Sequence, residues 1–432
     1  MNLLFFALAS LFFPQSESSA NTADRLREYV EHLASDKMEG RAAGYPGNDR
    51  AAKYLVDLLK EWGVKPAGRG GSYFQPFEFR KRNDRGPRSE SGKAPTRNVA
   101  AWIPGSDRKL KKEVVVIGAH FDHVGTSEQA DAGRAGRASA DDNIWNGADD
   151  NASGSSMLLE IARSLIEEGV KPKRSILFLW FSAEEAGLLG SKWYADHPLH
   201  PLENTVAMIN LDMVGKGISK LDIGAAGTSD SWRDFISRGE KATGISPATI
   251  TDKYSPDSDH ASFAAKEIPT IFFFTGLHAD YHRTSDHAER LDYEGMEATA
   301  KLARSILVDL ANTTAPPEWT DPSKAKGEKA IDSLGASGYE VGGRWIRKNG
   351  YSSFPKKGAG VRVTKVEVDS NASAAGIEKG DVIYAFGKAG FGSGSAVKQI
   401  DILAEKVSSG KKVSIRIVRD GKRKTLSVRW KT

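Results

Sequence analysis

The chain of 432 residues has no cysteine, which excludes a disulfide scaffold, a thiolate metal site and a cysteine nucleophile. Any metal ion must therefore be held by histidine, aspartate and glutamate side chains. A strong excess of one charge is also missing, because the formal net charge is only +5. No RNA- or DNA-binding motif accompanies the basic segments, so we expect solvated surface and no nucleic-acid partner.

Long apolar runs are missing after the N-terminus, where no segment approaches the ~20 apolar residues that a membrane span needs. Residues 3–13 form a short apolar run, and small residues follow at positions 18–20. This order is typical of a secretory signal peptide over residues 1–20, although no lysine or arginine precedes the run. We expect an exported protein, periplasmic or extracellular; the alternatives are a buried N-terminal helix or a lipid-surface anchor.

Four short runs of continuous apolar residues predict strands over residues 114–118, 175–181, 206–211 and 270–275. Continuous apolarity is typical of strands that are buried on both faces of a sheet. Helical patterns lie between and around them, for example Met157, Leu158, Ile161 and Leu165 at spacings of three or four residues. Further helices are predicted over residues 22–38, 48–62 and 293–311. The sequence thus predicts a three-layer α/β domain with a largely parallel sheet over residues 22–311.

The C-terminal part of the chain has a different texture. Residues 312–337 are rich in proline, serine, lysine and glycine and keep no apolar period, so we predict a linker. After it come short β-type runs, one helical pattern over residues 395–408 and a two-residue hairpin signal at residues 419–422. A second, small β-rich domain is therefore predicted over residues 338–432.

Five acidic or histidine clusters follow predicted strands or open a predicted helix: HFDH (120–123), GADDNASG (147–154), SAEEAG (182–187), LDM (211–213) and YHRTSD (281–286). In an open α/β sheet, ligands bind beyond the carboxyl ends of the strands, where such loops converge. Each cluster alone could be a turn, a helix cap or a solvated pair. All five in this arrangement favour one metal site.

The residue types of these clusters suit zinc, which takes imidazole nitrogen and carboxylate oxygen as ligands. Two zinc ions could share a carboxylate and a water, lower the pKa of that water and polarise a carbonyl group. A carboxylate beside them could take the proton of the water and pass it to a leaving amine.

Residues 22–311 resemble the dizinc exopeptidases of the aminopeptidase Y and secreted bacterial leucyl aminopeptidase type, which are clan MH zinc peptidases. This family also includes glutamate carboxypeptidase II and glutaminyl cyclase. Besides the five clusters, the stretches EGRAAGYPGNDRAAKYL and FFFTGLHADYHRTSDHAE fit its pattern. The resemblance implies the zinc exopeptidase fold, an αβα sandwich around a mostly parallel mixed sheet, and two Zn²⁺ ions per chain.

The resemblance also implies a ligand set. His120 and Asp212 would hold one zinc, Glu185 and His282 the other, and Asp150 would bridge the two. It further implies a cis peptide bond after Asp150.

Glu184 resembles the general base of the family, and Asp122 resembles the acid that orients the first histidine ligand, His120. Asp286 is expected to support His282.

Other details are not fixed by the resemblance. The tyrosine that stabilises the oxyanion in some members could be Tyr254 or Tyr281. Four further histidines are expected to be structural, pocket-wall or loop residues: His123, His260, His278 and His287.

Residues 338–432 resemble a PDZ domain of the circularly permuted kind found in bacterial proteases, most clearly over NASAAGIEKGDVIYAFG (371–387). YSSF (351–354) is the counterpart of the carboxylate-binding loop but lacks its glycine. The domain could bind a peptide or protein C-terminus by β-augmentation, or it could be a packing module of the peptidase domain.

We therefore expect a zinc aminopeptidase that removes N-terminal residues from peptides. Other enzymes of the same family remain open, namely a carboxypeptidase or a glutaminyl cyclase-like enzyme, which works with one zinc. A non-catalytic peptide-binding protein is the alternative of another class, and the intact Glu184 counts against it.

Overall fold

The computed structural model describes residues 21–80, 93–130, 136, 138, 141–321, 329–342, 359–378, 380–391, 395–419 and 422–431. The predicted signal peptide and the YSSF stretch lie outside these residues. None of the helices in the described ranges is long and apolar enough to cross a membrane.

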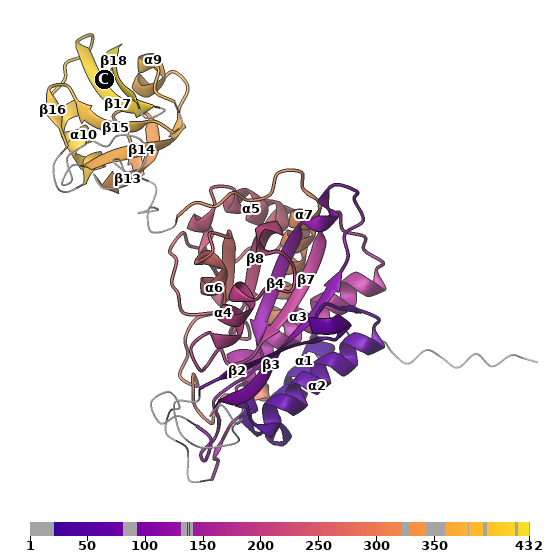
Figure 1. Ribbon diagram of the computed structural model, residues 1–432. Helices are drawn as coiled ribbons and strands as arrows, with labels where there is room; N and C mark the ends of the chain where they lie inside the picture. Colours follow the sequence, from indigo (N-terminus) through magenta and orange to yellow (C-terminus); the bar gives the residue numbers. More distant parts are fainter. Residues whose placement is uncertain are drawn as a thin grey trace, which may run out of the picture.

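The first domain is built on a nine-stranded mixed sheet, counted over the described residues (Figure 1). Its strands are β1 (Lys65–Pro66), β2 (Phe74–Phe79), β3 (Ala94–Ile103), β4 (Val114–His120), β7 (Ser175–Phe181), β8 (Thr205–Leu211), β9 (Asp222–Gly224), β10 (Thr249–Ile250) and β11 (Thr270–Phe274). The strand order is β1-β3-β7-β4-β8-β11-β9-β10, and β2 pairs with β3. The four central strands β7, β4, β8 and β11 are parallel, and they are the four strands that the apolar runs predict.

Helices cover both faces of this sheet, which confirms the three-layer prediction (Figure 1). The seven α-helices of the described first domain are α1 (Thr22–Leu33), α2 (Pro46–Glu61), α3 (Gly154–Glu167), α4 (Leu189–Asp196), α5 (Trp232–Thr243), α6 (His260–Ala264) and α7 (Tyr293–Asn312). Along β4, Val115 and Ile117 pack in the larger core cluster with α1, α3 and α7. Val114 and Val116 pack on the opposite side with Tyr194 of α4. Every residue of β4 is buried because both faces are covered, which explains its continuous apolar run.

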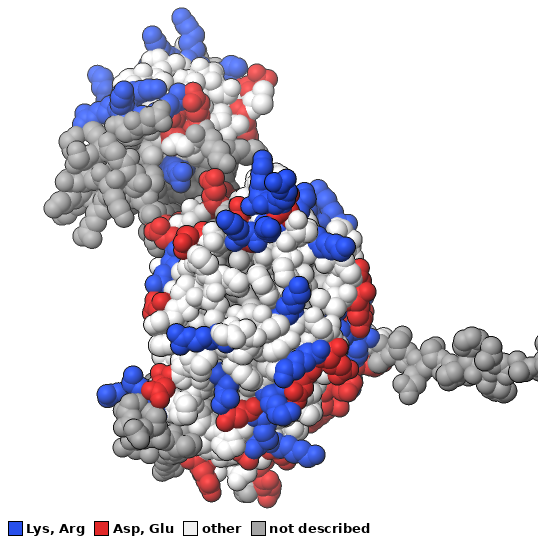
Figure 2. All heavy atoms as spheres, turned by 45° about the vertical axis from the view of Figure 1, so that its right-hand side comes forward, with Lys and Arg blue, Asp and Glu red and all other residues white. Residues whose placement is uncertain are grey.

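Both charge signs are mixed on the surface of the first domain. On the face shown in Figure 2, lysine and arginine side chains are interspersed with aspartate and glutamate.

The second domain is a seven-stranded sheet of β12 (Lys329–Ile331), β13 (Ala336–Gly342), β14 (Ala359–Val366), β15 (Val382–Phe386), β16 (Ala389–Gly390), β17 (Lys412–Arg419) and β18 (Lys422–Arg429). The helices α9 (Asn371–Ala375) and α10 (Ala396–Ala404) pack on it. Strands β17 and β18 are paired up to Arg419 and Lys422, so the predicted hairpin is present. The domain has its own core, separate from that of the first domain.

The predicted linker overlaps this second sheet. Strand β12 begins at Lys329 and β13 at Ala336, although we predicted a linker up to residue 337. Ile331 and Leu334 are fully buried in the second core. Two apolar residues in a polar segment give no readable period, so the sequence pattern missed them.

The N-terminal region differs from the prediction in a way that positions the site. The helix predicted over residues 22–38 ends at Leu33, and a 3₁₀ segment follows from Asp36 to Arg41. Gly40 has φ +61°, and a Cβ there would lie 2.5 Å from the main-chain oxygens of Gly125 and Trp145. Only glycine fits this close approach, which brings Arg41 into the interior.

Arg41 joins three segments of the main chain. Its guanidinium group is fully buried and donates hydrogen bonds from Nε to Phe121 O (2.8 Å) and from Nη1 to Leu33 O (2.6 Å). It also donates from Nη1 to Asn146 O (2.6 Å) and from Nη2 to Gly147 O (2.8 Å). The loop after β4 and the segment before α3 are thus held together by one side chain.

Replacing Arg41 by methionine should destabilise the fold. Four buried carbonyl groups would lose their donor, and each unsatisfied buried group costs about 1–3 kcal/mol, so we expect a loss of at least ~3 kcal/mol in the free energy of unfolding. Urea unfolding followed by tryptophan fluorescence measures it. The control is Arg50→Met, which removes an exposed hydrogen bond to Lys37 O and a surface ion pair with Glu39 and should cost about 1 kcal/mol or less. Equal losses for both variants would contradict this role of Arg41.

Candidate metal centre

The predicted site residues come together at the carboxyl ends of the central parallel strands. His120 ends β4, and Glu185 lies in the loop after β7. Asp212 directly follows β8, and His282 lies in the loop after β11. Asp150 belongs to the segment that leads into α3. Five segments that are distant in sequence therefore meet at one place.

The first group of potential ligands consists of His120, Asp150 and Asp212, all buried. His120 Nε2 lies 3.2 Å from Asp212 Oδ1 and 3.3 Å from Asp150 Oδ1. The predicted ligands of one zinc therefore face one another.

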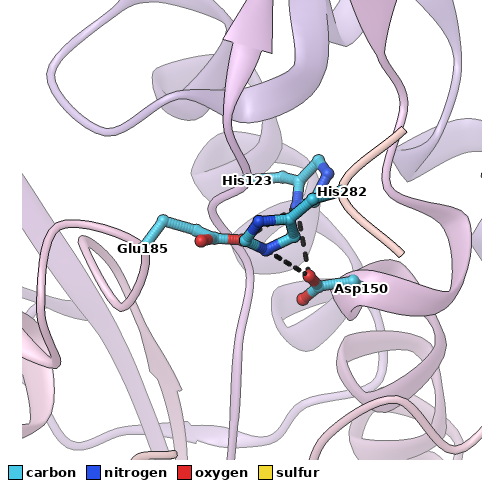
Figure 3. A group of neighbouring side chains, drawn as sticks. All are labelled: His123, Asp150, Glu185 and His282. Atoms are coloured by element: carbon cyan, nitrogen blue, oxygen red, sulfur yellow. Dashed lines mark hydrogen bonds and ion pairs between the residues drawn. The ribbon is translucent and has the colours of Figure 1, made fainter. Parts of the chain in front are cut away.

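The second group consists of Asp150, Glu185, His282 and also His123 (Figure 3). His282 Nε2 lies 3.0 Å from Asp150 Oδ2 and 3.2 Å from Glu185 Oε1. His123 Nδ1 lies 3.0 Å from the same Glu185 oxygen and 3.7 Å from Asp150 Oδ2. Asp150 thus turns Oδ1 to the first group and Oδ2 to the second, which is the arrangement that a bridging carboxylate needs.

The donor atoms fit zinc in type and spacing. Ligands about 2.1 Å from a tetrahedral zinc ion lie roughly 3.4 Å apart. The distances between imidazole nitrogens and carboxylate oxygens in the two groups are 3.0 to 3.7 Å. Buried carboxylates that converge in this way need a cation among them.

The electrostatics of the second group show strong coupling between its acids and histidines. Burial alone would lower the pKa of His282, but the carboxylates of Glu185 and Asp150 raise it to about 11. Burial and Asp150 would raise the pKa of Glu185, yet His282 and His123 lower it to about 2. The acids are therefore ionised and ready to bind a cation, and the metal would replace the imidazole protons as counter-charge.

Glu184 lies beside the first group, half-buried, at the start of the loop after β7. Burial raises the pKa of Glu184 well above its usual range, the neighbouring His120 opposes this, and Glu185 adds to it. A carboxylate with a raised pKa suits the role of a proton acceptor near neutral pH.

Asp122 supports both glutamates. Its Oδ1 accepts the main-chain N–H of Glu184 (3.0 Å), and its Oδ2 accepts that of Glu185 (3.2 Å). Its main-chain oxygen lies 3.2 Å and its carboxylate 3.7 Å from His120 Nδ1, so Nε2 of that ring is directed to the ligand group. This placement agrees with the orienting role that the resemblance implies.

Other polar side chains fix the acidic ligands. Ser258 Oγ donates to Asp212 Oδ2 (2.6 Å), and Asn210 Nδ2 donates to Ser258 Oγ (2.7 Å). The carboxylate of Asp286 accepts the main-chain N–H groups of Asp149 and Asp150 at 3.0 to 3.1 Å. We predicted that Asp286 supports His282; its described hydrogen bonds instead hold the segment of Asp150.

Unusual backbone conformations surround the site. The Asp150–Asn151 peptide bond is cis, as the resemblance implies. Ala183 before Glu184, Met213 after Asp212 and His282 itself have φ between +52° and +59°. Non-glycine residues in this region are uncommon and cluster at functional sites.

His123, which we expected to be a structural or pocket-wall residue, lies in the second group of potential ligands. Its place directly after Asp122, in the loop after β4, is the one signal that could have drawn attention to it. The other three histidines lie elsewhere: His260 stacks on Phe272, His278 Nε2 lies 3.0 Å from Asp149 Oδ2, and His287 Nε2 lies 3.4 Å from Asp142.

The two candidate tyrosines differ in their surroundings. Tyr281 stacks on His282 with ring centroids 4.0 Å apart. Burial raises the pKa of Tyr281, and the carboxylates of the centre, beginning with Asp150, raise it further. Tyr254 makes an edge contact with His260 instead. Tyr281 is therefore the tyrosine that lies next to the second ligand group.

Both domains of the chain are similar to known protein families. Residues 98–307 match peptidase family M28, and residues 341–429 match the PDZ domain. A probable leucine aminopeptidase of Arthroderma otae is 30% identical over 228 residues, which are 50% of this chain and 57% of the relative. Aminopeptidase YwaD of Bacillus subtilis is 28% identical over 234 residues, 51% of this chain and 47% of the relative. The chain spans about half the length of the curated relatives that it matches.

The same fold is seen in a solved zinc aminopeptidase of Bacillus subtilis, with a TM-score of 0.54 and 17% identity over 68% of this chain and 96% of that one. The two groups of His, Asp and Glu side chains that could hold a metal ion lie in the part of the chain that matches the peptidase family. Over residues 98–307 the chain is thus similar to peptidase family M28, and over residues 341–429 to the PDZ domain.

Proposed function

We propose that the chain is a zinc-dependent aminopeptidase that removes N-terminal residues from peptides at a two-zinc centre. The observation that carries the proposal is the position of Asp150, whose two carboxylate oxygens face two separate groups of ligands. The names of the relatives, leucine aminopeptidase and aminopeptidase, support the choice of aminopeptidase over carboxypeptidase.

The side chains of the site have distinct tasks in this proposal. His120 and Asp212 would hold one zinc, Glu185 and His282 the other, and Asp150 both. The bound zinc ions would lower the pKa of a water molecule between them and polarise the peptide carbonyl. Glu184 would take a proton from the attacking water and deliver it to the leaving amine. Asp122 would keep Glu184 in position through its main-chain N–H.

The variant Glu184→Gln separates chemistry from metal binding. It keeps the size of the side chain but removes the proton acceptor, so hydrolysis of aminoacyl-p-nitroanilides should fall by at least about 100-fold, the lower range for general-base catalysis. Metal analysis should still find two zinc ions per chain. Glu167→Gln, on the exposed side of α3, is the matched control and should keep full activity. Retained activity in Glu184→Gln would rule out the assigned base, and one zinc per active wild-type chain would favour a cyclase-like enzyme.

We further propose that the PDZ domain recruits long substrates by binding an extended chain end. Because the second sheet begins at Lys329, the truncation should remove residues 322–432. The shortened enzyme should lose kcat/KM on long peptides about tenfold more than on an aminoacyl-p-nitroanilide, which is too small to reach a second site. Equal losses on both substrates would indicate a packing module instead.

Export is part of the proposal, because residues 1–20 have the order of a signal peptide. Full-length protein expressed in a bacterial host should be recovered outside the cytoplasm, with an N-terminus at Asn21. Intact mass and N-terminal sequencing measure this directly. Protein recovered in the cytoplasm with residues 1–20 still attached would contradict it.

A further inference from the structure

We infer that His123 is a fourth protein ligand of the zinc at Glu185 and His282, so that the two metal positions are unequal. This inference rests on the proposed two-zinc centre. His123 and His282 come from different loops, yet both rings turn one nitrogen towards the same two carboxylate oxygens (Figure 3). Their ring centroids are 5.6 Å apart at an interplanar angle of 76°.

The described surroundings of His123 give its ring no hydrogen-bonding role outside the site. The side chain is fully buried, and its described polar contacts, to Glu185 and Asp150, are all made by Nδ1. Nε2 has no hydrogen-bond partner among the described residues. A buried histidine that only served packing would be expected to have its ring nitrogens satisfied by the protein. Its one directed nitrogen instead lies among metal-ligating groups.

The backbone makes room for this ring. Gly147 has φ +57°, and a Cβ on it would lie 2.5 Å from Cγ and Cδ2 of His123. The carbonyl group of Gly147 is held by Arg41 Nη2 at 2.8 Å. The ring therefore occupies a space that exists because residue 147 has no side chain, directly against the segment of Asp150.

Counting donors then shows the inequality. The second position has four protein donors, two imidazole nitrogens and two carboxylates, from His123, His282, Glu185 and Asp150, so a water shared with the first position would be its fifth ligand. The first position has three protein donors, from His120, Asp150 and Asp212, and keeps a place for water or substrate. The fourth ligand thus makes the two metal positions unequal in their protein donors, four against three.

Metal binding by the full-length chain tests this inference without relying on activity. The apoprotein, prepared with a chelator, is titrated with Zn²⁺ in competition with a chromophoric chelator, and with Co²⁺ while its visible absorption is recorded. Wild type should bind two ions. His123→Phe keeps the ring volume but offers no donor, so one of the two affinities should fall by more than about 100-fold. For comparison, loss of a residue that only contacts a ligand typically lowers metal affinity by about 10–100-fold. The Co²⁺ absorption of that ion should also weaken, because more than one water could bind where the ring is lost, and a higher coordination number lowers the intensity of the visible bands.

Controls keep the outcomes distinct. His287→Phe changes a half-exposed histidine of a neighbouring loop, paired with Asp142, and should leave both affinities and the Co²⁺ spectrum unchanged. Thermal unfolding of the apoproteins shows whether His123→Phe is folded. If it is not, His123→Asn is measured instead, because it keeps a small polar group near the position of Nδ1. We expect the same loss of metal affinity for this variant. Two unchanged affinities and an unchanged spectrum in a folded His123 variant would overturn the fourth ligand and leave the proposed function standing. A wild-type chain that binds no zinc would overturn both.

Discussion

The mutual repulsion of buried carboxylates is the constraint on which the rest of the site depends. Asp122, Asp150, Glu185 and Asp212 are each less than 9% exposed and lie within one small volume. Such a concentration of negative charge is costly in the interior unless cations and hydrogen-bond donors surround it. The fold provides both. Imidazole groups face the acids, main-chain N–H groups point at Asp122 and Asp286, and the buried guanidinium group of Arg41 remains charged although burial lowers its pKa to about 10. A metal ion at the proposed centre would complete this balance.

The parallel direction of the central strands explains why these acidic and histidine side chains lie close together. Because β7, β4, β8 and β11 run the same way, their following loops all open at the same edge of the sheet. Neighbouring strands then deliver Glu185, His120, Asp212 and His282 in spatial order across that edge. The segment before α3 adds Asp150 to this group of side chains. The next residue, Asn151, connects the segment to β8 because its Nδ2 donates a hydrogen bond to Leu211 O at 2.9 Å. Two of these side chains leave directly from buried strands, because His120 ends β4 and Asp212 follows the last residue of β8.

The parts of this structure that follow a pattern could be predicted from the sequence, and the parts that depend on a single contact could not. Strands β4 and β7 were predictable because burial on both faces leaves continuous apolar runs. The five predicted site residues could be picked out because their clusters stand at strand ends and match a family pattern, and the structure brings them together. The position of His123 among them could not be predicted, since a histidine beside such a motif looks the same in the sequence whether its ring points in or out. The partners of Asp286 were missed for a related reason: main-chain N–H groups leave no trace in sequence. Strand β12 was missed because Ile331 and Leu334 are two apolar residues in a polar stretch and give no readable period.

The consecutive glutamates show how the fold assigns different roles to identical side chains. Glu184 and Glu185 are neighbours in the chain, yet one lies beside the His120 group and the other within the His282 group. Their main-chain N–H groups are both held by the carboxylate of Asp122, and Ala183 before them is forced to φ +59°. A turn held at both N–H groups fixes where the two side chains leave the backbone. The difference between a lowered pKa in Glu185 and a raised one in Glu184 then follows from what each meets: imidazole rings for Glu185, and burial among like charges for Glu184. The acid–base properties of these two side chains thus depend on where the main chain places them, which is how a loop of ordinary composition can carry a potential metal ligand and the proposed base side by side.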